Sequence, residues 1–108
     1  MLGHMVYFKL KDNSPPAIET MVAACQRYLT GHPGTVLFAA GTRTVDLNRA
    51  VNDRDFDVAL QLVFDSREAH DQYQAAPRHQ QFIEENNDNW AQVRVFDADV
   101  SYSPRGRE

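Results

Sequence analysis

Two histidines and a tyrosine in this chain have the chemistry needed to move protons. His4 lies near the start of the sequence, and Tyr73 and His79 flank a short segment that contains Pro77. An imidazole close to its ordinary pKa accepts or donates a proton at neutral pH, and a phenol can hydrogen-bond to a substrate oxygen or enolate. We therefore predict proton abstraction next to a carbonyl, followed by aldol-type ring closure or isomerisation, with His79 as general base. Tyr73 would hold the oxygen, and His4 would support or share the proton.

The same three side chains also have a structural interpretation, in which none of them reacts. Buried histidines and tyrosines commonly satisfy backbone groups or each other. His4 would then tie its strand to the helices, and His79 would cap or brace the turn at Pro77. A cavity on the order of a few hundred Å3, lined by the three residues, favours binding or catalysis. Close packing, with both histidines hydrogen-bonded to backbone, favours the structural interpretation.

The composition is typical of one ordinary globular domain. The chain has 108 residues, of which 43% are hydrophobic and 24% are charged, and its net charge is −4. A chain of this length suits a single modest core. Positive and negative side chains are interspersed, so no basic block predicts nucleic-acid binding and no basic amphipathic face predicts a membrane surface. We expect a single domain over residues 1–108, with a polar tail at 103–108.

The N-terminal residues and the cysteine content predict a cytoplasmic location. The first residues run directly into a strand-like segment and lack the charged and apolar regions of a secretory signal. No apolar run approaches the ~20 residues that span a bilayer. Cys25 is the only cysteine, so it cannot form an intramolecular disulfide. Its place on the apolar stripe of a helix predicts a buried, inert thiol.

Alternating apolar residues predict strands in this chain, and apolar residues at three- and four-residue spacing predict helices. Ser14 suits the N-cap of the first helix, and Asp65 or Ser66 that of the second. Pro77 interrupts the second helix and starts a third. In chain order, the predicted segments are strand 5–11, a helix containing residues 18–29, a turn at 31–34, strand 35–43, surface loop 44–55, strand 56–64, two helices separated at Pro77, a turn at 86–89 and strand 92–102.

This order of elements is the βαββαβ order of a ferredoxin-like α+β sandwich. Such a domain has one antiparallel four-stranded sheet with its helices on one face. His4 shares a strand face with Val6 and Phe8, which should point at the helices. Tyr73 and His79 should point back at the sheet from the apolar faces of the next two helices. A small cavity between sheet and helices would then hold both imidazoles and the phenol.

The other face of the predicted sheet is too apolar to be left in water. Its residues include Met5, Tyr7, Ala59 and Val63. One chain has too few helices to cover both faces, and a second sheet packed on the first would cover the open one. We therefore predict a homodimer through this face. The alternative is a monomer with a partly exposed sheet.

Three segments form an ordered set along almost the whole chain. They are His4-Met-Val-Tyr-Phe-Lys-Leu-Lys11, then Phe64-Asp-Ser-Arg-Glu-Ala69 leading to Tyr73, Pro77, His79 and Phe82, and finally Val95-Phe-Asp97. At these spacings the set resembles the stress-responsive dimeric α/β-barrel (Dabb) family, from His4 to about Tyr102. The resemblance implies a ferredoxin-like protomer and a dimer whose two sheets form a barrel-like core.

The resemblance also implies candidate proton carriers. A plant polyketide cyclase of this family uses a strand histidine, a helix tyrosine and a histidine after a proline, at positions that resemble His4, Tyr73 and His79. It implies no substrate, since many members have no assigned reaction. The leading prediction is a homodimer that binds a small apolar or aromatic molecule between sheet and helices. The alternatives are a cyclase- or isomerase-type enzyme and a stress-related structural dimer without catalysis.

The remaining polar and aromatic residues carry weaker signals. His32 lies in a Gly-Pro turn and is predicted to be a solvated loop residue, and His70 is predicted to face outward on its helix. Neither is spaced from another ligand in a way that predicts a metal site. Asp97 and Asp99 are predicted to be an edge-strand charge pair that opposes aggregation. Trp90 is expected in the core or a dimer interface. No phosphate loop or dinucleotide motif predicts a cofactor.

Overall fold

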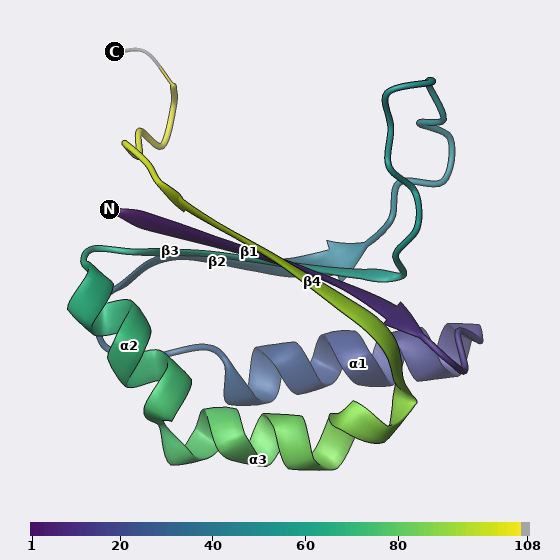
Figure 1. Ribbon diagram of the computed structural model, residues 1–108, viewed down its shortest axis with the longest axis horizontal. Helices are drawn as coiled ribbons and strands as arrows, with labels where there is room; N and C mark the ends of the chain where they lie inside the picture. The colour runs from purple at the N-terminus through teal and green to yellow at the C-terminus, as the bar shows by residue number, and fades with distance from the viewer. Residues whose placement is uncertain (107–108) are drawn as a thin grey trace.

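The computed structural model describes residues 1–106, which form a four-stranded sheet with helices on one face (Figure 1). The elements are β1 (Leu2–Leu10), α1 (Pro15–Tyr28), β2 (Thr35–Thr42), β3 (Val58–Phe64), α2 (Arg67–Ala75), α3 (Pro77–Asn86), the short 3-10 helix η1 (Asn87–Asn89) and β4 (Trp90–Asp99). This order confirms the predicted ferredoxin-like α+β fold.

Pairing in the sheet brings the two ends of the chain together. The strand order is β2-β3-β1-β4, and every neighbouring pair is antiparallel. The first strand is therefore central, and the last strand forms an edge beside it. In the β1–β4 register, His4 is opposite Asp97 and Val6 is opposite Val95. The pairing places the N-terminal histidine next to an acidic residue that lies more than ninety positions away in sequence.

The core lies between the sheet and the helices. Side chains on successive strand residues point to opposite faces, and the helix-facing members of β1 and β3 are almost completely buried. The buried cluster comprises Leu2, Val6, Phe8, Leu10, Met21, Cys25, Tyr28, Leu29, Val58, Leu60, Leu62, Phe64, Ala69, Tyr73 and Phe82. The predicted burial of Cys25 is confirmed, and burial raises the pKa of its thiol to about 12. This thiol is therefore protonated and unreactive at neutral pH.

Two local signals place α2 and α3. The Ser66 hydroxyl accepts a hydrogen bond from the backbone N–H of Ala69 at 3.1 Å, which fixes the start of α2. Ala76, the residue before Pro77, has extended backbone with ψ of 141°, as a residue preceding proline prefers. The chain turns there, so that α2 crosses one end of the sheet and α3 runs beneath it beside α1 (Figure 1).

The observed strands differ from the predicted ones at their ends. The first strand starts at Leu2 because residues 2–4 pair with strands on both sides. The third strand begins at Val58, and the last strand is Trp90–Asp99, since its pairing with β1 starts at Trp90.

The predicted loop at 44–55 rises from the sheet on the side away from the helices (Figure 1). Of the predicted tail at 103–108, residues 107–108 lie outside the described residues.

In the described part of the chain, none of the helices combines the length and the apolar character that a membrane span needs.

Candidate functional site

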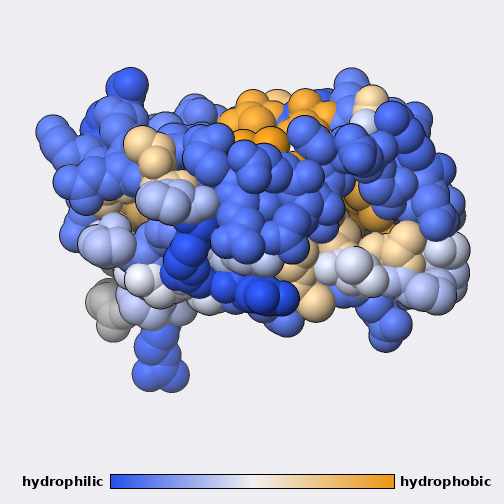
Figure 2. Space-filling model, turned by 90° about the horizontal axis from the view of Figure 1, so that it is seen from below, coloured by the Kyte–Doolittle hydropathy of each residue, from blue (hydrophilic) through white to orange (hydrophobic). Residues whose placement is uncertain are grey.

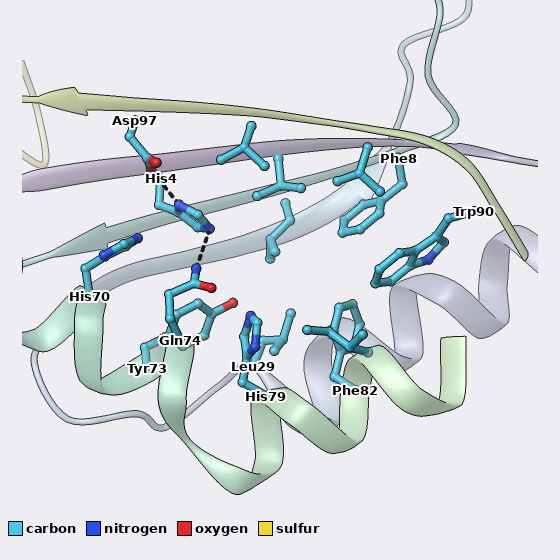
Figure 3. A pocket seen from close by; sticks show the side chains of 15 residues that line it. His4, Phe8, Leu29, His70, Tyr73, Gln74, His79, Phe82, Trp90 and Asp97 are labelled. Atoms are coloured by element: carbon cyan, nitrogen blue, oxygen red, sulfur yellow. Dashed lines mark hydrogen bonds and ion pairs between the residues drawn. The ribbon is translucent and has the colours of Figure 1, made fainter. Parts of the chain in front are cut away.

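A pocket of about 480 Å3 lies between the sheet and the pair α2 and α3 (Figure 3). His4, Tyr73 and His79, predicted from different parts of the sequence, all line it. The other lining residues are Val6, Phe8, Leu29, Leu60, His70, Gln74, Phe82, Ile83, Trp90, Val93, Val95 and Asp97. The pocket therefore has a polar end, formed by histidines, and an aromatic end.

His4 is held by an acidic partner at the polar end. Its ring is buried, and its Nδ1 lies 2.6 Å from Oδ1 of Asp97, whose side chain is about half exposed. If Nδ1–H donates to this carboxylate, the lone pair of Nε2 remains free for another partner. The side-chain nitrogen of Gln74 is 3.4 Å from Nε2, across the pocket (Figure 3). A carboxylate that fixes the imidazole tautomer in this way is a common feature of histidines that accept protons.

His79 has a different environment on the opposite wall. Burial, reinforced by the nearby imidazoles of His4, His32 and His70, lowers its pKa to about 4. Its Nδ1 is buried and has no hydrogen-bond partner within residues 1–106. His79 is therefore neutral at pH 7 and has an unused polar atom in the pocket. An imidazole of such low pKa is a weak base, which argues against the predicted role of His79 as the main proton acceptor.

Tyr73 lies between the histidines on α2. Only 2% of the residue is exposed, and its ring centroid is 4.7 Å from that of His79 and 6.0 Å from that of His4. Burial raises the pKa of its phenol above the ordinary value. The hydroxyl is therefore protonated at neutral pH and can donate a hydrogen bond, as the sequence-based role requires.

His32 is buried, so its prediction as a solvated loop residue is wrong. Its Nε2 is 2.8 Å from the backbone carbonyl oxygen of Tyr28, and its ring packs edge-on against Tyr73 with centroids 5.0 Å apart. The reason is the tight turn that follows α1, in which Gly31 and Gly34 have φ of 74° and 81°. This turn folds the loop back onto the helix layer.

His70 faces the pocket, so its prediction as an outward-facing residue is also wrong. Its side chain is only 14% exposed, and its ring centroid lies 5.1 Å from that of His4. The spacing contains a signal that could have found it: His70, Tyr73 and Gln74 are at positions i, i+3 and i+4, and all three line the pocket.

Asp97 was predicted to be an edge-strand charge pair with Asp99, and its contact with His4 was missed. Asp97 does lie on an edge strand and is exposed. Its role in the pocket follows from the register of β4 on β1, which a single sequence does not specify. His4, His70 and Asp97 also place three potential metal-ligand atoms within 4.8 Å of one another, although the sequence predicted no metal site.

The aromatic end is formed by Phe8, Phe82 and Trp90, with ring centroids 5.0 to 6.2 Å apart. The sequence analysis expected Trp90 in the core or in a dimer interface, and the structure packs it against the core. Val93 and Val95 on β4 are 39% and 49% exposed and line the pocket opening. Seen from the helix side, the surface is mostly hydrophilic, with hydrophobic side chains gathered along one edge (Figure 2).

Fold and pocket together define a ferredoxin-like α+β protein with a small-molecule-sized cavity between its sheet and one pair of helices. Residues 2–100 match the model of the stress responsive A/B barrel domain, and the chain belongs to this family, as the sequence resemblance predicted. Among curated protein sequences, no match was found.

Solved structures share the fold at low sequence identity. A Dabb family protein with a ferredoxin-like fold from Mesorhizobium loti is 16% identical, with a TM-score of 0.76 over 94% of this chain and 97% of that chain. A dimeric ferredoxin-like protein of unknown function from Thermobifida fusca is 20% identical, with a TM-score of 0.74 over 92% and 90%. The hydroxynitrile lyase from Passiflora edulis is 22% identical, with a TM-score of 0.73 over 94% of both chains. At these identities the similarity establishes the fold alone.

Proposed function

We propose that this protein binds a small, largely apolar or aromatic molecule in the pocket between its sheet and α2 and α3. The observation that supports the proposal is a cavity of about 480 Å3 with an aromatic end and a polar end. Ligand pockets usually measure roughly 300–1,000 Å3 and combine apolar walls with a few polar groups. The apolar part of the ligand would contact Phe8, Phe82 and Trp90. A carbonyl or hydroxyl group would lie near Tyr73 and His79.

The only tryptophan of the chain offers a direct binding assay, because Trp90 lines the pocket. Titration with a panel of alkylphenols, aryl ketones and β-diketones should change its fluorescence saturably. Val95→Arg, which places a charge at the opening, should weaken binding at least ten-fold. Val36→Arg is the matched control, since Val36 is an exposed valine on the opposite edge strand. Equal affinity in the two variants would contradict the proposal.

A second candidate function is acid–base catalysis of the cyclase or isomerase type, and the His4–Asp97 contact specifically supports it. With Nδ1–H bound by the carboxylate, Nε2 of His4 carries the lone pair that can accept a proton, whereas burial lowers the pKa of His79 to about 4. We infer that His4 removes the proton next to a carbonyl. Tyr73 and His79 would donate hydrogen bonds to the enolate oxygen that forms. His4 thus takes the role of general base that the sequence analysis assigned to His79, and His79 becomes a second hydrogen-bond donor to the oxygen.

Proton abstraction can be measured without knowing the natural substrate. Ketones that bind should exchange the hydrogen next to their carbonyl for deuterium in D2O, which NMR detects. Asp97→Asn should slow this exchange by about 10²–10⁴-fold, because it removes the carboxylate that holds the His4 imidazole in the proton-accepting tautomer. Asp99→Asn is the matched control, two residues along the same strand. A screen of β-polyketide and enol-lactone substrates with wild type, Tyr73→Phe and His79→Gln tests the oxygen donors. Deuterium exchange at the same rate in the Asp97 and Asp99 variants would rule out the His4–Asp97 pair as the proton-accepting unit.

We further propose a homodimer formed through the open face of the sheet. Phe96 is 54% exposed there and packs edge-on against Tyr7, which in turn contacts Phe56. The Thermobifida fusca relative is described as dimeric. The loop that rises on this side presents exposed Val45, Leu47 and Val51, which would pack against a second copy.

We also propose a cytoplasmic location. A single buried free cysteine suits a reducing compartment.

Light scattering at micromolar concentration tests the homodimer. Wild type should have the mass of two chains, and Phe96→Asp should have the mass of one. Val93→Asp is the matched control, because Val93 is an exposed residue of the same strand that lies on the helix-facing side. A monomeric wild type would overturn the proposal. A stress-related structural dimer remains the alternative if a dimer forms and no ligand in the panel binds.

A further inference from the structure

One corner of the pocket brings together side chains that suit a transition metal. His4 on β1, His70 on α2 and Asp97 on β4 each offer one ligand atom, and these atoms lie within 4.8 Å of one another (Figure 3). Imidazole nitrogens and carboxylate oxygens are common ligands of Zn2+ and its neighbours in the first transition row. We propose that His4, His70 and Asp97 bind one divalent transition-metal ion, represented by Zn2+.

His70 is already arranged as a metal ligand. Its Nδ1 is 2.9 Å from Oδ1 of Asp71, a carboxylate that Arg67 also contacts at 2.9 Å. A proton on Nδ1 donates to this carboxylate, which leaves Nε2 with a free lone pair. Nε2 is buried and has no hydrogen-bond partner in the described part of the chain. A carboxylate behind the far nitrogen is the usual support of a metal-binding histidine, and it fixes both tautomer and ring orientation.

The three ligand atoms lie within 4.8 Å of one another and would have to rearrange around the ion. Zn–ligand bonds of about 2.0–2.1 Å in tetrahedral geometry put ligand atoms roughly 3.3 Å apart. Nδ1 of His4 and Oδ1 of Asp97 are 2.6 Å apart, so an ion would replace the proton between them and separate them slightly. The Asp97 side chain is 47% exposed and can rotate, and it lies where an ion would enter. Three protein ligands leave a fourth position for water, as in catalytic zinc sites.

The metal site does not depend on the proposed ligand binding or catalysis. It uses only the polar corner of the pocket, whereas the fluorescence of Trp90 reports on the aromatic end. A metal ion and a free His4 base exclude each other, because both need the ring nitrogens of His4. The two proposals can therefore fail separately.

Isothermal titration of the chelator-treated full-length chain with ZnCl2 tests the site. We expect one Zn2+ per chain, binding at roughly micromolar or tighter dissociation constants, with proton release that appears as a buffer-dependent enthalpy. MgCl2 should not bind, since Mg2+ prefers oxygen ligands. His70→Gln should weaken Zn2+ binding at least ten-fold.

The controls separate this site from adventitious binding. Asp97→Asn should also weaken binding at least ten-fold, and it provides a second test if His70→Gln does not fold, as judged by circular dichroism. Asp99→Asn and His79→Gln should bind Zn2+ as wild type does. In NMR spectra, Zn2+ should shift the imidazole resonances of His4 and His70 more than those of His79. Absence of Zn2+ binding at about millimolar concentration, or unchanged binding in both ligand variants, would overturn the proposal.

Discussion

Loss of stability on mild acidification is the sharpest prediction for the pocket, and it comes from His79. The unfolded chain binds a proton at this residue near pH 6.5, whereas the folded protein does so only near pH 4. Below pH 6.5 the unfolded state therefore binds more protons than the folded state, so acid favours unfolding. The contribution of His79 to stability is fully present above pH 6.5 and is lost progressively as the pH falls toward 4.

The two pKa values set the magnitude. Each unit of difference corresponds to about 1.4 kcal/mol. Between pH 7.5 and pH 5.0, an imidazole that moves from 6.5 to about 4 on folding contributes a loss of about 2 kcal/mol in the free energy of unfolding. His79→Gln removes the titrating group and keeps a polar side chain of similar reach.

Urea denaturation at a series of pH values tests this reasoning. The difference in unfolding free energy between wild type and His79→Gln should change by about 1–2 kcal/mol from pH 7.5 to pH 5.0, in favour of the variant in acid. The other three histidines are present in both proteins, so the comparison reports on His79, and EDTA removes any metal. An NMR titration should place the His79 imidazole pKa well below 6. Parallel stability curves, or an ordinary imidazole pKa, would refute the explanation.

Three further predictions concern positions that fix the fold around the pocket. Gly34→Ala should destabilise the protein by about 2–4 kcal/mol in urea denaturation, because φ is 81° and an added Cβ would lie 2.9 Å from Asp65 Oδ1 and still closer to Ala69; wild-type stability would contradict this. Ser66→Ala should cost about 1 kcal/mol by the same assay, since it removes the α2 cap, whereas Ser66→Asp should retain most of that stability. Leu29→Ala, in a fully buried pocket wall, should cost about 2–5 kcal/mol and enlarge the cavity; a loss below 1 kcal/mol would contradict the assigned packing.

The fold could be predicted from the sequence because its signals are local and mutually consistent. Alternation in residues 56–64, the N-cap Ser66 and the interruption at Pro77 each depend on near neighbours, and the structure confirms all three elements. Strand ends were less predictable, since pairing partners decide them. The start of β1 at Leu2 follows from hydrogen bonding to β3 and β4, which lie far away in sequence.

Two residues of the polar end of the pocket were harder to predict, for the same physical reason. His4, Tyr73 and His79 were found because each shares a face with apolar residues that must be buried. Asp97 and His70 lie at the margin of the core, where the pattern of apolar residues carries little information. The contact of Asp97 depends on the β4 register, and His70 is indicated only by its spacing of three and four residues from Tyr73 and Gln74. His32 was missed because a glycine turn can face either water or protein.

The histidines around the pocket fall into two groups, because some of them contact a carboxylate and the others do not. His4, His32 and His79 pack against Tyr73, and His70 packs against His4; within residues 1–106, only His4 and His70 have an acidic partner, Asp97 and Asp71 respectively. In both pairs the carboxylate contacts Nδ1; the Nε2 atom of His4 is contacted by Gln74, and that of His70 has no hydrogen-bond partner in residues 1–106. His32 and His79 have no such partner in residues 1–106, and burial makes His79 hard to protonate. The proposals for a proton or a metal ion therefore both concern the side with carboxylates, and the proposal for an apolar ligand concerns the side where His79 stays neutral.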